Sequence, residues 1–151
     1  MSDIVIDQES GSLTMNGEHV GSDFKFEKFK NIFSSEIRLI YGKDETAKYG
    51  LINPVNMFGM KFRIYFLFEE GGVRNCTMEL IENAVLVDAD YPSYSELQQE
   101  VEHLFQVYKT EFMGAFSSKY KWKKVWSYNW GRIVLAQEAH NSRVITEIIW
   151  G

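Results

Sequence analysis

Hydrophobic and polar residues alternate at the start of the chain. Between Asp3 and Gln8, Ile4 and Ile6 fall on one face of an extended chain, and the same pattern resumes at Leu13 and Met15. Alternation with a period of two is typical of a strand with one buried face. The Asn-Gly pair at residues 16–17 is a strong hairpin-turn signal. We therefore expect the chain to begin with a small antiparallel β-meander.

The spacing changes to three and four residues shortly afterwards. Apolar residues that would share one helical face occur at Phe26, Phe29, Ile32 and Phe33. Ser22 and Asp23 precede them and are side chains that can cap a helix N-terminus. The pattern predicts a short helix that begins near residue 24 and ends near residue 34.

The strongest strand signal lies in the middle of the chain. Phe62, Ile64, Phe66 and Phe68 alternate with other residues, and a Glu-Glu-Gly-Gly turn follows at residues 69–72. Residues 73–81 then return as a second strand, which together predicts a hairpin. Shorter extended segments are expected at residues 37–41 and 49–55.

A longer amphipathic helix is predicted over residues 94–113. Ser93 and Glu96 have the spacing of a capping box, in which each side chain bonds to the backbone of the other residue. One apolar stripe follows over five turns, at Leu97, Val101, Leu104, Phe105, Tyr108 and Phe112. This helix should lie across the sheet.

The remaining chain returns to strand patterns at residues 125–128, 132–136 and 144–150. Because no linker or internal repeat interrupts the 151 residues, we predict a single domain over residues 1–151. The expected fold class is α+β, an antiparallel β-sheet of about six or seven strands with one short and one long helix packed on it.

The composition and the apolar runs of the chain indicate its cellular compartment. Cys76 is the only cysteine, which excludes an intramolecular disulfide and a zinc site built from several cysteines. The first thirty residues have neither the basic segment nor the apolar segment of a secretory signal. Apolar runs are much shorter than the roughly 20 residues that span a bilayer. We therefore expect a cytoplasmic protein that does not enter the membrane.

Charge is strongly segregated in the second half of the chain. Residues 75–108 contain no Lys or Arg, whereas residues 112–137 contain five basic residues and no acid. The net charge of −5 disfavours general binding to nucleic acid phosphates, which depends on clustered basic residues. Opposite charges separated in this way leave open a self-complementary homodimer.

The chain contains no recognisable enzyme motif. It has no nucleophile elbow, no phosphate-binding loop and no dinucleotide-binding glycine pattern. Its three histidines, His19, His103 and His140, do not have a metal-binding spacing. Cys76 is predicted to be a buried thiol within a strand. We predict no catalytic residue, cofactor or metal, although a hydrolase with an unrecognised site stays open.

Two segments are candidates for recognition. The first is the acidic segment from Glu79 to Glu102, where tyrosines among carboxylates could bind a protein partner with a basic surface. Its candidate contacts are Asp88, Asp90, Tyr91, Glu96 and Glu100. The alternative is a solvated loop and helix start, where acids favour the helix dipole. In residues 119–130, lysines interleaved with aromatics could grip a single-stranded nucleic acid. They could equally form one strand whose lysines protect a sheet edge.

Several of these segments together resemble a known group of proteins. They are the turn residues 10–17, the helix over residues 24–33, the strand over residues 62–68 and the late Val-Trp-Ser-Tyr at residues 125–128. This arrangement resembles small bacterial cytosolic proteins encoded as immunity partners of polymorphic or contact-dependent toxins.

The resemblance implies a non-catalytic binding function. An immunity protein neutralises its cognate toxin by direct binding, and many such toxins are nucleases with basic clefts, to which an acidic face is complementary. The alternatives are an accessory module that binds another protein or a small ligand, and the hydrolase mentioned above.

Overall fold

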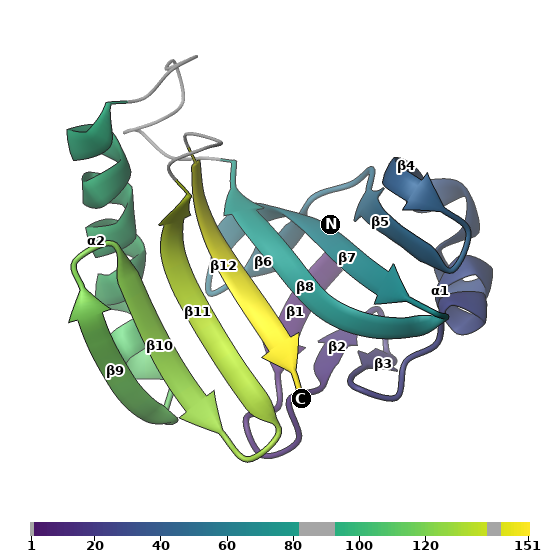
Figure 1. The fold of residues 1–151 in the computed structure, drawn as a ribbon, viewed down its shortest axis with the longest axis horizontal. Helices are drawn as coiled ribbons and strands as arrows, with labels where there is room; N and C mark the ends of the chain where they lie inside the picture. Colours follow the sequence, from purple (N-terminus) through teal and green to yellow (C-terminus); the bar gives the residue numbers. More distant parts are fainter. Residues whose placement is uncertain (1, 82–92, 139–142) are drawn as a thin grey trace.

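The computed structural model describes residues 2–81, 93–138 and 143–151. In these residues the chain forms one large sheet, two α-helices and a short 3-10 helix at Ser34–Glu36 (Figure 1). The helices are α1 (Phe26–Phe33) and α2 (Tyr94–Glu111). The strands are β1 (Ser2–Ile6), β2 (Leu13–Met15), β3 (Glu18–Val20), β4 (Ile37–Lys43), β5 (Thr46–Leu51), β6 (Val55–Met57), β7 (Met60–Glu69), β8 (Gly72–Leu80), β9 (Ala115–Tyr120), β10 (Lys123–Tyr128), β11 (Gly131–Glu138) and β12 (Arg143–Trp150).

The described strands form a twelve-stranded mixed sheet in the order β3-β2-β1-β6-β7-β8-β12-β11-β10-β9, with β4 and β5 branching from β7. The prediction of an antiparallel sheet with six or seven strands is therefore wrong in its details, although the α+β class is confirmed. Strands β1 and β6 run parallel, with Ser2 opposite Val55. This long-range pairing and the three-residue strand β6 produce no clear pattern in the sequence. The expected N-terminal β-meander is confirmed, since β2 pairs antiparallel with both β1 and β3.

The sheet forks at β7. Strand β6 pairs with residues 60–62 of β7, and β5 pairs with residues 65–68 on the same side. Arg63 and Ile64 therefore lie between the two pairings. On its other side, β7 pairs with β8 from Phe62 to Glu69, which confirms the predicted central hairpin.

Both helices pack against one face of the sheet. Phe29 of α1 lies with its ring centroid 5.4 Å from that of Phe66 and 4.9 Å from that of Phe68. The stripe of α2 is buried, as predicted, and α2 contacts β11 and β12. In Figure 1 the helices and β1 to β3 lie behind the broad part of the sheet formed by β7, β8, β12, β11 and β10, whose other face is turned toward the viewer.

Two hydrogen bonds join the N-terminal meander to the C-terminal part of the chain. The indole nitrogen Nε1 of Trp150 donates to the Gly11 carbonyl oxygen at 2.8 Å, and Nε1 of Trp130 donates to the Gln8 carbonyl oxygen at 2.8 Å. Gly11 has a φ of +79°, and a Cβ at this position would lie 2.4 Å from the Trp130 ring. A glycine is therefore required at this turn.

Two local predictions are corrected. Helix α1 is preceded by Lys25, which makes no side-chain cap, so Ser22 and Asp23 do not cap it. Residues 119–130 do not form one strand, because β9 and β10 form a hairpin that turns at residues 121–122. As the edge-strand interpretation implies, β9 ends the sheet.

Of the helices described, neither combines the length and the apolar composition needed to cross a membrane.

Candidate functional site

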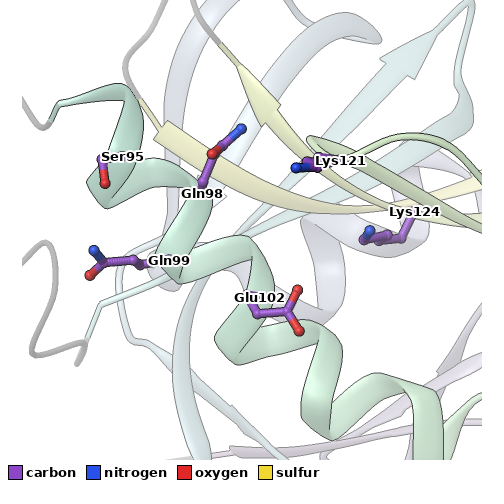
Figure 2. Close-up of a pocket in the computed structure, with 6 residues that line it drawn as sticks. All are labelled: Ser95, Gln98, Gln99, Glu102, Lys121 and Lys124. Atoms are coloured by element: carbon purple, nitrogen blue, oxygen red, sulfur yellow. The ribbon is translucent and has the colours of Figure 1, made fainter.

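A groove lies between α2 and the β9–β10 hairpin (Figure 2). Its cavity volume is about 420 Å³, and its lining residues are Ser95, Gln98, Gln99, Glu102, Lys121 and Lys124. We call it the α2 groove. It joins the two segments with opposite charge, since its first four lining residues come from the acidic helix and the two lysines come from the basic hairpin.

Helix periodicity places the α2 side of the groove. Ser95, Gln99 and Glu102 are separated by four and three residues, so they lie on one face of the helix. The buried stripe that begins at Leu97 and Val101 holds the other face against the sheet. The capping box fixes where the helix begins: Ser93 Oγ accepts from the Glu96 amide at 3.1 Å, and the Ser93 amide donates to Glu96 Oε1 at 3.1 Å.

An aromatic cluster fixes the hairpin side of the groove. The ring of Phe105 on α2 stacks on that of Phe116 on β9, with centroids 5.5 Å apart, and Trp126 on β10 packs against both. Lys124 Nζ lies 4.9 Å from the Phe105 ring centroid and donates to Ser118 Oγ at 3.0 Å. This cation–π contact holds an ammonium group beside the helix.

The groove presents both signs of charge without pairing them. Glu102 Oε1 accepts from Gln106 Nε2 at 2.6 Å. Among the residues that the structure describes, no ion pair joins Glu102 to Lys121 or Lys124. With two glutamine amides beside them, these groups can bond to polar and charged side chains of a partner. Small-molecule sites are more enclosed and more apolar than this lining.

The residues predicted as partner contacts have different positions. Glu96 is partly exposed at the start of α2, where its carboxylate bonds to the Ser93 backbone. Glu100 is only 1% exposed, so it is not at the surface where a partner contact would have to lie. It is three residues after Leu97 and four before Leu104, which puts it on the buried side. Asp88, Asp90 and Tyr91 lie outside the described residues.

Sequence reasoning selected only one side of the groove: Lys121 and Lys124 belong to the candidate segment at residues 119–130, whereas none of the four lining residues on α2 was a candidate contact. Glu102 belonged to the acidic segment but was not among the candidate contacts. Gln98 and Gln99 carry no charge, so the charge pattern gave no signal for them. The three- and four-residue spacing from Ser95 to Glu102 could have identified their common face.

The uncovered face of the sheet carries an ion-pair network. Arg143 on β12 bonds through Nε to Glu138 Oε1 of β11 at 2.5 Å, and through Nη1 to Glu79 of β8. The network therefore links three neighbouring strands. Burial raises the pKa of the Glu147 carboxyl on β12, and nearby Glu138 raises it further. Burial also lowers the pKa of Lys48 on β5, and Arg143 adds to this effect.

The described residues bear on two kinds of reactive group, a bound metal ion and a thiol nucleophile. No group of three His, Cys, Asp or Glu side chains in this part of the chain is placed to hold a metal ion. Cys76 is buried in β8, as predicted, and burial raises the pKa of its thiol well above the usual value. A thiolate nucleophile is therefore disfavoured at this position.

These features define a class: an α+β protein with a strongly branched mixed sheet and a polar, mixed-charge surface groove. No protein-family model matches the chain, and no curated protein matches it. Its fold is similar to one chain of the solved structure described as Rhs1-CT in complex with cognate immunity protein RhsI1. The TM-score is 0.56 at 13% identity, over 99% of this chain and 87% of that chain. At this identity the similarity establishes a shared fold.

Proposed function

We propose that this protein is an immunity protein that neutralises a cognate bacterial toxin by direct binding. The observation that carries the proposal is the similarity in fold, over 99% of the chain, to a component of a complex that contains an immunity protein. The resemblance seen in the turn and core residues of the sequence points to the same class. The proposed site of action is the cytoplasm.

The α2 groove supports a binding function. Glu102 bonds to Gln106, and Lys124 lies against the Phe105 ring and bonds to Ser118, so a partner would meet two charges that are already positioned. Complementary charges increase the rate of association and exclude wrong partners. Asp88, Asp90, Tyr91 and Glu96 stay in the proposal as further contacts, on the evidence of the sequence. A toxin with a basic surface, such as a nuclease, is the partner class that this acidic segment suits.

The test is co-expression with the toxin-like product of the neighbouring gene. We expect the protein to restore growth of cells that produce this toxin and to form a stable complex with it. We also expect expression of the protein alone to leave growth unaffected. Toxicity of the protein by itself, or failure of the wild-type chain to bind and protect, would overturn the proposal.

Variants test the groove separately from the function. Glu102→Lys and Lys121→Glu should each weaken toxin binding by about tenfold, because each reverses a charge at the contact. Glu111→Lys is a matched control, since this exposed glutamate is nine residues further along α2 and half a turn around it. The control should bind within about twofold of wild type. Equal binding by all three variants would place the interface elsewhere while leaving the immunity function intact.

A further inference from the structure

The fork in the sheet leaves a second cavity of about 360 Å³, which lies at β4, β5 and β7. Its lining residues are Arg38, Leu51, Ile52, Pro54, Arg63, Tyr65 and Ile81. We call it the Arg38–Arg63 hollow. Strands β4 and β5, which contribute Arg38 and Leu51 to its lining, lie at the opposite end of the molecule from α2 (Figure 1).

Strand register brings the two arginines to one face. Arg38 of β4 is opposite Gly50 of β5, and Gly50 is opposite Tyr65 of β7. Arg63 precedes Tyr65 by two residues and shares its face. A Cβ on Gly50 would lie 3.0 Å from the Tyr65 ring and 3.5 Å from Ile40. Glycine at this position therefore lets the Tyr65 ring, which lines the hollow, lie directly over β5.

The lining of the hollow is basic, although the chain as a whole is acidic with a net charge of −5. Of the described residues that line it, two are arginines and none is a carboxylate. Glu79, which is opposite Arg63 in β8, pairs with Arg143 instead. Within the described part of the chain, neither Arg38 nor Arg63 forms an ion pair. A guanidinium group binds a carboxylate through two parallel hydrogen bonds, so this lining is suited to an Asp or Glu side chain.

The adjoining strand has an open, apolar edge. Among the described strands β4 pairs only with β5, so its other edge leaves backbone groups available. On β4, Leu39 is 53% exposed and Tyr41 56%. Exposed apolar edges of this length promote strand addition by a partner chain. A small carboxylate ligand would fill the hollow but would leave this edge uncovered.

We propose that the Arg38–Arg63 hollow and the open edge of β4 form a docking surface for an extended acidic segment of the toxin. The segment adds to β4 as a strand, and one of its Asp or Glu carboxylates binds Arg38 and Arg63. This inference rests on the proposed immunity function. A second copy of the protein fits less well, because β4 itself (IRLIYGK) contains arginine and lysine but no acid.

The experiment measures toxin binding by the wild-type protein and by the Arg38→Ala, Arg63→Ala double variant. We expect the double variant to lose at least about tenfold in affinity, because the bound carboxylate loses both partners. Arg74→Ala is the matched control: its exposed side chain forms an ion pair with Glu69 at 3.4 Å, away from the hollow. It should bind within about twofold of wild type.

Hydrogen–deuterium exchange supplies a readout that a purely structural effect would not change. In the wild-type complex, amides of residues 37–43 should exchange more slowly than in the free protein, because the added strand bonds to them. If the double variant does not fold, the single variants Arg38→Lys and Arg63→Lys replace it. Each keeps the charge, loses the paired geometry and should bind more weakly than wild type.

The outcomes separate this inference from the proposed function. If the wild-type protein does not bind the toxin, both are overturned. If it binds, but the arginine variants bind equally well and β4 amides stay unprotected, only the docking surface is overturned. If the β4 amides become protected without toxin as the concentration of the protein rises, the open edge of β4 binds a second copy. That result would also overturn the docking surface.

Discussion

The hydroxyl oxygens of Tyr108 and Thr146 lie 2.6 Å apart in the core, where this hydrogen bond joins α2 to β12. Both side chains are buried. Because α2 forms one wall of the α2 groove, the contact also fixes the position of the candidate site relative to the sheet.

Removing the two hydroxyls of this pair should have effects on stability that are not additive. Tyr108→Phe or Thr146→Val leaves a buried hydroxyl without its partner, which costs about 1–3 kcal/mol of unfolding free energy. The double variant should cost less than the sum of the two single variants. Urea unfolding of the four proteins measures the cycle. Strict additivity would show that the two hydroxyls do not interact.

Gly11→Ala should destabilise the protein more than Gly17→Ala. Both glycines have a φ of +79°, but a Cβ at Gly11 would lie 2.4 Å from the Trp130 ring, whereas nothing lies within 4 Å at Gly17. The two variants share the backbone strain, and Gly11→Ala adds overpacking of about 1–3 kcal/mol. Urea midpoints measure the difference. Equal midpoints would contradict the docking of this turn on Trp130.

The Cys76 thiol should react only when the protein unfolds. It is fully buried, and burial, followed by the charge of Glu147, raises its pKa, so the native state offers neither access nor thiolate. We expect slow labelling by a thiol reagent in native buffer and rapid labelling in urea. Rapid labelling of the folded protein would show that β8 is accessible.

Glu147→Gln should stabilise the protein at pH 7. Burial and then Glu138 raise the pKa of the Glu147 carboxyl in the folded state, so folding disfavours its ionised form. Because the folded state holds the Glu147 proton more tightly than the unfolded state, the protonated carboxyl contributes stability. This stability is fully present below the unfolded pKa of about 4.3, and it is lost as pH rises through the folded pKa. Glutamine stays neutral, so the variant should lose less stability between pH 4 and pH 7. The measurement is unfolding free energy against pH, and a variant less stable than wild type at pH 7 would contradict it.

Local signals in the sequence predicted much of the secondary structure. The alternation from Phe62 to Phe68, the capping box at Ser93 and the stripe of α2 all correspond to observed elements. Each of these signals lies within one element or one turn. The turn at residues 121–122 was missed because Lys-Trp contains none of the usual turn residues, so β9 and β10 looked like one strand.

The remaining features depend on pairing between distant segments. The parallel pairing of Ser2 with Val55 and the fork at β7 have no local pattern. The α2 groove forms only because Phe105 stacks on Phe116 across the helix–hairpin contact. Charge alone could not identify it, since two of its lining residues are glutamines. The burial of Glu100 was predictable from its spacing to Leu97 and Leu104, but its charge dominated the interpretation.

The bonds from Trp130 and Trp150 to the first turn set the order in which folding can finish. Gly11 and Trp150 are separated by 139 positions in the sequence. During synthesis β1 to β3 leave the ribosome well before their anchors, Trp130 and Trp150. Contacts between such distant residues slow folding because a long loop must close before they form. The N-terminal meander is therefore locked in place only after translation has passed Trp150.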